Sequence, residues 1–187
     1  VTQTLSAGWH IISLPVMPAD ASLAALFPDA ISAYTYVNGN YAQVSALETC
    51  EGYWVNLATG GQYGMTGQAV EECSRSWPAG WSVMGVPKGG TAVGAIIQDP
   101  VQSTFIVWRM NGSYELTDTM EEGQGYWVQL GEAGMLTMHG GATAAKAAVD
   151  VRREVAPTGS KLMVESAGHV ATLDLGAAAE AMVALPP

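Results

Sequence analysis

Short runs of branched and aromatic residues alternate with glycine, proline and Asn-Gly pairs along most of the chain. Such runs predict β-strands, because β-branched and aromatic side chains pack well on a pleated surface. We expect strands at 9–14, 31–37 and 104–110. Asn-Gly follows the last two of these runs, at 38–39 and 111–112, and predicts a hairpin turn because both residues tolerate positive φ.

Two short helical turns are expected within this strand pattern. Asp20 can cap a helix whose apolar face includes Leu23 and Phe27. Thr91 is in a similar place further along the chain and can cap a turn that ends near Gln98. The remaining strands are expected to begin at Tyr41 and Tyr114 after the hairpin turns, to include the two Gly-Tyr-Trp-Val runs, and to end near Met65 and Met138.

The same order of motifs occurs twice. Residues 7–15 match residues 79–87 at an offset of 72, and the Gly-Tyr-Trp-Val run at 52–55 matches that at 125–128 at an offset of 73. A slip of one residue over the whole unit indicates internal duplication. The predicted organisation is therefore a first β repeat at 1–70, a second at 71–141, and a linker with a C-terminal β segment at 142–187.

A mostly β fold follows from these repeats. Each predicted unit is a small antiparallel sheet that cannot bury both faces alone. Two units packed together would form a sandwich or a pair of half-barrels with short helices. The extended C-terminal segment would add further strands.

The repeat resembles a module of bacterial secreted and cell-surface proteins that reads Gly-Trp-Asn-Leu-Ile-Ser-Leu-Pro and, later, Gly-x-Gly-Tyr-Trp-Val. Gly8-Trp9 and Gly80-Trp81 carry the first motif, with His10 and Ser82 at the position of the asparagine. In the second motif Cys50 stands where the first glycine is expected. The resemblance implies an exported protein that includes adhesive, sorting or anchoring modules, and it brings no catalytic residues.

The C-terminal segment differs from the repeats. Strands are expected at 151–155, 161–165 and 169–175, with a turn at 166–168. Residues 162–176 resemble the opening hairpin of an immunoglobulin-like module found at the ends of exported bacterial proteins, including hook-capping-like sorting domains. The residues taken as candidate assembly strands are Val151, Val155, Leu162, Val164, Leu173 and Leu175.

Composition and charge exclude several classes of protein. The chain has 187 residues, of which 49% are hydrophobic and 13% are charged, and this is not the composition of a disordered chain. Its net charge of -10 opposes binding to nucleic acid phosphates. No apolar stretch of about twenty residues is present, so no helical membrane span is expected.

The two cysteines, Cys50 and Cys73, leave two possibilities open. In an exported protein they would pair and close a loop of moderate length. The alternative is a pair of buried thiols. We favour the disulfide, together with an extracellular or cell-surface location.

Motifs for catalysis are absent from the sequence. The histidines at 10, 139 and 169 lack a second ligand at metal-binding spacing, and no nucleophile elbow or phosphate-binding loop is found. We therefore expect no enzyme activity, no cofactor and no metal. An acidic cluster at 115–122 is interpreted as solvated charge, with calcium binding as the alternative.

Six tryptophans offer the remaining candidate chemistry. The pairs Trp9/Trp81 and Trp54/Trp127 recur at equivalent places and are predicted to anchor the core. The aromatic residues without a match in the repeat are candidates for exposed contacts to a glycan or a partner. Those named as candidate contacts are Trp108, Tyr36, Tyr34 and Trp77.

Two functions remain as hypotheses. The first is a non-catalytic structural subunit of an extracellular filament, sheath or surface layer, a homo-oligomer or polymer joined by intermolecular addition of the C-terminal strands. The second is a carbohydrate- or surface-binding adhesive module excised from a larger secreted protein.

Overall fold

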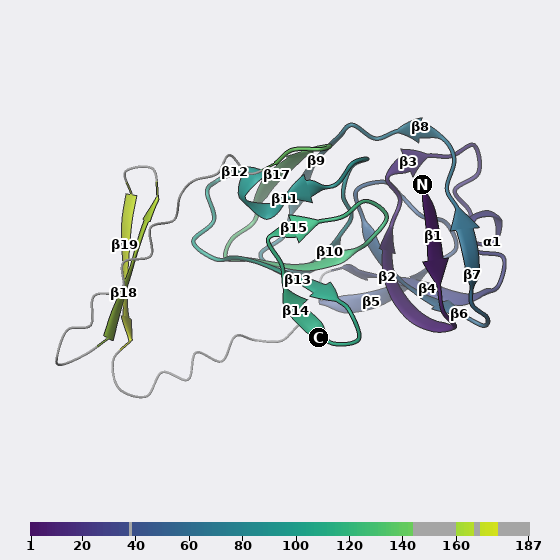
Figure 1. Cartoon of the computed structure of the whole chain (residues 1–187), viewed down its shortest axis with the longest axis horizontal. Helices are drawn as coiled ribbons and strands as arrows, with labels where there is room; N and C mark the ends of the chain where they lie inside the picture. The colour runs from purple at the N-terminus through teal and green to yellow at the C-terminus, as the bar shows by residue number, and fades with distance from the viewer. Residues whose placement is uncertain (38, 144–159, 167–168, 176–187) are drawn as a thin grey trace. The chain divides into compact units, whose positions relative to one another are not determined.

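The computed structural model describes residues 1–37, 39–143, 160–166 and 169–175 (Figure 1). The fold is mostly β and is built from several antiparallel sheets, as the sequence predicts. The chain divides into two compact units. One unit comprises Val1–Thr143, and the other contains the last two strands, so the two are described separately.

A four-stranded antiparallel sheet forms the centre of the first repeat. It contains β2 (Gly8–Ser13), β4 (Ala30–Val37), β5 (Asn40–Val44) and β6 (Gly52–Leu57), in the order β2-β6-β4-β5. The predicted strands therefore form, and β4 and β5 pair as a hairpin in which Val37 lies opposite Asn40. Asn38 of the expected turn lies outside the described residues.

The second repeat contains a sheet of the same topology. Its strands are β10 (Gly80–Met84), β13 (Phe105–Met110), β14 (Tyr114–Leu116) and β16 (Tyr126–Leu130), in the order β10-β16-β13-β14. The internal duplication is therefore a duplication of strand order. Smaller sheets complete the two repeats: β1 (Thr2–Leu5) with β7 (Gly61–Gly64), β3 (Val16–Met17) with β8 (Gln68–Ala69), β11 (Thr91–Ala92) with β15 (Thr119–Met120), and β12 (Ile97–Asp99) with β17 (Gly134–His139) and β9 (Glu72–Trp77).

Three hydrophobic clusters hold the larger unit together. One lies within the first repeat around Ile12, Phe27 and Tyr53, and a second lies within the second repeat around Met84 and Tyr126. The third joins the repeats. Its buried members are Ile11, Val83, Trp108 and Trp127.

The two repeats meet through reciprocal backbone contacts. The amide of Ser13 donates to the carbonyl oxygen of Gly123 over 2.9 Å, and the amide of Gly85 donates to that of Cys50 over 3.0 Å. In the duplication Ser13 corresponds to Gly85 and Cys50 corresponds to Gly123, so the second hydrogen bond is the equivalent of the first with the repeats interchanged. The bridges Ile12–Gln124 and Glu51–Met84 correspond in the same way. The contacts between the two repeats therefore have approximate two-fold symmetry.

This contact explains the glycine of the Gly-Tyr-Trp-Val motif. A β-carbon on Gly52 would lie 2.5 Å from Val83 Cγ1, and one on Gly125 would lie 2.5 Å from Ile11 Cγ2. Neither distance is possible in a packed protein, so glycine permits the close approach of the repeats.

A local hydrogen bond explains the tyrosine of the Gly-Tyr-Trp-Val motif. The Tyr53 hydroxyl accepts a hydrogen bond from the amide of Glu48 over 2.8 Å, and the Tyr126 hydroxyl accepts one from that of Glu121 over 2.6 Å. Each tyrosine therefore satisfies a backbone donor in the loop that precedes its own strand.

The predicted helix caps were wrong. Helix α1 (Leu23–Leu26) begins after Ser22, whose hydroxyl accepts from the amide of Ala25, while Asp20 accepts from the amide of Ser22. A serine placed three residues before that amide is the better cap because its oxygen reaches the first turn. In the second repeat Thr91 lies in β11, and the 3-10 turn η1 (Val93–Ala95) has no side-chain cap.

Cys50 and Cys73 form a disulfide, with a sequence separation of 23. Cys50 has φ +68, and Gly123, its equivalent in the second repeat, has φ +82. The position thus requires a left-handed backbone, which glycine adopts more easily than cysteine. Because Cys73 lies in β9, the bond ties the first repeat to the second.

The C-terminal strands β18 (Ser160–Ser166) and β19 (His169–Leu175) form an antiparallel two-stranded sheet. Two of the predicted strands are thus confirmed. The register pairs Leu162 with Leu173 and Val164 with Ala171. The candidate assembly residues Val151 and Val155 lie outside the described residues. No helix in the described parts of the chain is long and apolar enough to cross a membrane.

Candidate functional site

Aromatic side chains gather on one face of the first repeat's main sheet. Successive residues of a strand point to opposite faces, so Trp9 and Ile11 of β2 face away from Ile12, which lies in the core of the repeat. The register places Trp54 of β6 opposite both Ile11 and Tyr34 of β4. Strand alternation and register therefore bring Trp9, Tyr34 and Trp54 to the same face.

These rings line an open groove of about 580 Å³. The ring centroids of Trp9 and Tyr34 are 6.0 Å apart, and those of Trp9 and Trp54 are 6.3 Å apart with planes at 78°. Tyr41 of β5 and Met110 of β13 complete the lining, so both repeats contribute. Trp9 is 50% exposed and Tyr41 is 49% exposed, so ring surface is available to a ligand. We call this feature the aromatic groove.

Polar residues share the face with these rings. Asn56 is paired with both Trp9 and Ser32, and Gln43 is paired with Tyr34. The side-chain amides of Asn56 and Gln43 have no hydrogen-bond partner within 1–37 and 39–143. Each amide offers two donors and an acceptor to a ligand.

Tyr41 adds a hydroxyl to the groove. Partial burial raises the pKa of Tyr41, and the nearby Tyr114 and Tyr36 raise it further. The hydroxyl therefore remains protonated at neutral pH.

Two of the predicted contact residues lie in the interior. Trp77 and Trp108 are each 8% exposed, so the expectation that they present ring faces to a ligand is not met. Trp77 packs in the core of the second repeat, and the guanidinium of Arg75 lies over its ring, 5.3 Å from the ring centroid. Trp108 lies in the cluster between the repeats, where sheet packing excludes solvent.

The other two predicted contact residues, Tyr34 and Tyr36, lie in different surroundings. Tyr34 lines the aromatic groove, whereas Tyr36 packs on Trp127 with ring centroids 4.9 Å apart. The prediction that the recurring tryptophans anchor the core is right for Trp127, which is 0% exposed, and wrong for Trp9. Trp9 is half-exposed and lines the aromatic groove.

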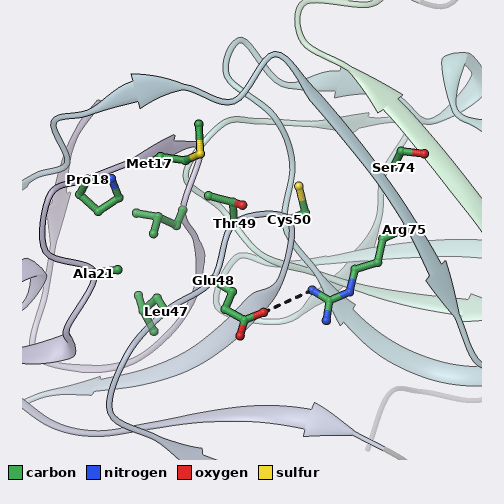
Figure 2. A pocket seen from close by; sticks show the side chains of 10 residues that line it. Met17, Pro18, Ala21, Leu47, Glu48, Thr49, Cys50, Ser74 and Arg75 are labelled. Atoms are coloured by element: carbon green, nitrogen blue, oxygen red, sulfur yellow. Dashed lines mark ion pairs between the residues drawn. The ribbon is translucent and has the colours of Figure 1, made fainter.

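A second hollow, of about 510 Å³, lies beside the disulfide (Figure 2). Arg75 extends toward Glu48, with Nη1 and Oε2 3.8 Å apart, and Arg75 also pairs with Glu51. Glu48 and Arg75 are the charged residues of the lining, which also includes apolar residues such as Leu14 and Met17. The Ser74 hydroxyl in this lining shares a hydrogen bond with the Thr137 hydroxyl over 2.8 Å.

The acidic cluster is engaged in ion pairs and hydrogen bonds. Glu122 pairs with Lys88 over 2.7 Å and accepts from the amide of Gly89, while Glu115 pairs with Arg109 over 2.8 Å. Hydrogen bonds from Lys88 lower the pKa of Glu122. Within the described residues no three His, Cys, Asp or Glu side chains gather into a metal-binding group.

The two histidines of the larger unit, His10 and His139, have local partners. His10 hydrogen-bonds through Nε2 to the carbonyl oxygen of Ser6 over 2.8 Å, and His139 Nδ1 lies 3.4 Å from Glu72. Both lie at strand surfaces, and neither adjoins the aromatic groove. Their contacts are those of surface side chains and assemble no catalytic group.

Comparison with protein-family models, with curated proteins and with solved structures gave no match for this chain. Any function must therefore be inferred from the geometry of the candidate site itself.

Sequence reasoning assigned Trp9 and Trp54 to the core and did not consider Tyr41 or Met110 as part of a site. A signal was present in the duplication. Where β4 carries Tyr36 next to its hairpin, β13 carries Met110, so the two copies differ at a position that faces the other repeat. Finding that difference requires the strand register, because the hairpin loops differ in length: four residues separate the paired Tyr36 and Tyr41, and three separate the paired Met110 and Tyr114.

Proposed function

We propose that this chain is a non-catalytic adhesive module of an extracellular protein and that it holds a neutral glycan in the aromatic groove. The observation that carries the proposal is the half-exposed ring of Trp9 beside Tyr34 and Trp54. Pyranose rings present C–H groups on their faces, and these are attracted to the negative face of an aromatic ring. Large rings with a few placed polar groups are typical of small-molecule sites.

Hydrogen-bonding groups beside the rings support this ligand class. A sugar exposes hydroxyls around its edge, and the free amides of Asn56 and Gln43 can pair with them. The net charge of -10 disfavours polyanionic ligands, because like charges repel. A neutral polysaccharide fits the site better than an acidic one.

An extracellular location is part of the proposal. Disulfides persist in oxidising compartments and are rare in the cytosol, where thiols are kept reduced. The Cys50–Cys73 bond, which joins the repeats, supports export of the protein.

The test is a binding screen with intrinsic tryptophan fluorescence and isothermal titration calorimetry. The panel contains cellohexaose, xylohexaose, laminarihexaose, chitohexaose and mannohexaose, with alginate as an anionic comparison. We expect at least one neutral glycan to bind and Trp9→Ala to weaken its binding about tenfold or more, since stacking on one ring contributes about 1–3 kcal/mol.

Ile97→Ala is the matched control. Ile97 is 56% exposed and lies in β12 of the second repeat, away from the groove lining. This variant removes exposed apolar surface of similar kind and should bind as the wild type does. If no neutral glycan in the panel shifts the fluorescence or releases heat, the proposal is lost.

A structural subunit remains the second candidate function, favoured by the C-terminal sheet. Strands β18 and β19 pair only with each other among the described residues, and an isolated two-stranded sheet is marginally stable in water. Adding a strand of a neighbouring molecule would complete the sheet, and such contacts can propagate into a filament, sheath or surface layer.

Negative-stain microscopy and sedimentation of the full chain test the second candidate. We expect fibres or oligomers, and we expect Val164→Pro to abolish them because proline removes a ladder donor from β18. Near-ultraviolet circular dichroism confirms that the larger unit remains folded in this variant. A strictly monomeric wild type at high concentration excludes assembly by this route.

A further inference from the structure

The aromatic groove has an equivalent in the second repeat. Trp54 and Trp127 occupy the same place in the Gly-Tyr-Trp-Val strands. Tyr34 is paired with Trp54, and Trp108 is paired with Trp127, so these two residues are also equivalent. The T-shaped contact of Trp9 with Trp54 is repeated by Trp81 with Trp127, whose centroids are 6.0 Å apart. Each repeat therefore builds the same aromatic platform.

The platform of the second repeat is covered by the first repeat. Tyr36 of β4 packs edge-to-face on Trp127 with centroids 4.9 Å apart, and Tyr41 lies 6.4 Å from the same ring. Trp127 is consequently 0% exposed. The two tyrosines act as a lid supplied by the opposite repeat.

The platform of the first repeat has no such lid. The register makes Met110 of β13 the equivalent of Tyr36, because each residue lies two positions beyond the partner of its motif tryptophan. Met110 does line the groove beside Trp54, as this relationship requires, but it is 38% exposed and brings no ring. A methionine in place of a tyrosine therefore leaves the groove open.

From this difference, and resting on the proposed glycan-binding function, we infer that an uncharged pyranose unit of a glycan chain sits on Trp54 in the position that Tyr36 occupies on Trp127. The sugar ring replaces the missing aromatic lid. Trp9 contacts the same unit or the next one along the chain, since the two indoles are 6.3 Å apart.

The direction of the chain follows from the sheet. Neighbouring strands lie about 4.8 Å apart, a spacing close to the length of one pyranose unit in an extended β-linked chain. A glycan laid across β2, β6, β4 and β5 would place successive units over successive strands. Asn56 of β6 and Gln43 of β5 would then meet hydroxyls of different units. The ligand class is an extended neutral β-linked polysaccharide.

The decisive variant is Met110→Tyr, which supplies the lid that the first repeat lacks without altering Trp9, Tyr34 or Trp54. Using the neutral glycan that binds best in the screen, we expect Met110→Tyr to weaken binding by about tenfold or more, since the ring would occupy the sugar position. Ile97→Tyr, which adds the same ring at an exposed position outside the groove lining, is the matched control and should bind within about twofold of wild type.

The outcomes separate the two proposals. If no neutral glycan binds the wild type, the function in glycan binding fails. If Trp9→Ala weakens binding but Met110→Tyr binds normally, glycan binding stands and the position on Trp54 is overturned. Preference for laminarihexaose, whose β-1,3 linkages curl the chain, over the extended β-1,4-linked glycans overturns the chain direction.

A second copy of this protein is another occupant that the experiment can detect. If sedimentation shows self-association that Met110→Tyr abolishes, and no glycan competes with it, the groove accepts a protein side chain and the inference is overturned. Thermal denaturation of Met110→Tyr and Ile97→Tyr establishes that both variants are folded before binding is compared.

Discussion

Gly52 lies so close to Met84 that a β-carbon on Gly52 would stand 2.9 Å from the Met84 carbonyl oxygen. The contact joins the motif strand of one repeat to the Gly-Trp strand of the other, and Gly125 makes the equivalent contact with Ile12. The aromatic groove depends on this approach, because Met110 reaches Trp54 only when the repeats pack together.

Gly52→Ala is expected to destabilise the protein by about 1–3 kcal/mol, because the added methyl group must push the two backbones apart. Urea unfolding followed by tryptophan fluorescence measures the change. Gly64→Ala is the matched control, since a β-carbon on Gly64 meets nothing within 4 Å, and its stability should stay close to that of wild type. Equal stability of the two variants would contradict the packing described here.

Loss of the disulfide is expected to cost about 3 kcal/mol, because the bond closes a loop across a sequence separation of 23 and restricts the unfolded chain. The measurement compares urea midpoints of wild type and the Cys50→Ser/Cys73→Ser variant. Mass spectrometry with and without reduction verifies the bond in the wild type.

The backbone at position 50 predicts a difference between two variants that both lack the disulfide. Cys50→Gly/Cys73→Ser should be more stable than Cys50→Ser/Cys73→Ser by about 1 kcal/mol, because φ is +68 there and glycine adopts this conformation without strain. Urea unfolding of the two variants under identical conditions tests the difference. A serine variant as stable as the glycine variant would show that the position relaxes.

Acid should weaken the contact between Lys88 and Glu122. Hydrogen bonds from Lys88 hold the pKa of Glu122 below its ordinary value of 4.5, so its contribution to stability is present above that value. The contribution is lost as the pH falls through the lower pKa of the folded state. Glu122→Gln should flatten the pH dependence of the unfolding midpoint below about pH 4.5. If the unfolding midpoint of Glu122→Gln depends on pH as steeply as that of wild type, Glu122 does not contribute to the acid dependence.

Alkaline solution should act on the motif tyrosine of the second repeat. Burial raises the pKa of Tyr126 to about 12, so its contribution to stability is complete below its ordinary value near 10 and is lost as the pH rises through about 12. An ultraviolet titration of wild type and Tyr126→Phe should show one late-ionising group that the variant lacks. A Tyr126 that titrates with the exposed tyrosines would contradict its burial.

Much of the fold follows from local sequence. The β-rich runs predict β2, β4 and β13, and the Gly-Tyr-Trp-Val motifs predict β6 and β16, because these signals depend on residues close together in the chain. The helix cap at Ser22 was missed because Asp20 and Ser22 are both good capping residues. The candidate site was harder to predict, since strand alternation identifies which residues share a face but not which face is covered.

The sequence by itself determined the duplication and the main strands of each repeat, whereas the order of the strands in each sheet and the pairing of Cys50 with Cys73 came from the structure. Only the tertiary structure decided that Trp127 is buried while Trp9 and Trp54 line an open groove. The physical reason is that exposure of each ring depends on a side chain from the other repeat, Tyr36 over Trp127 and Met110 beside Trp54. Such contacts between distant residues leave no periodic pattern along the chain.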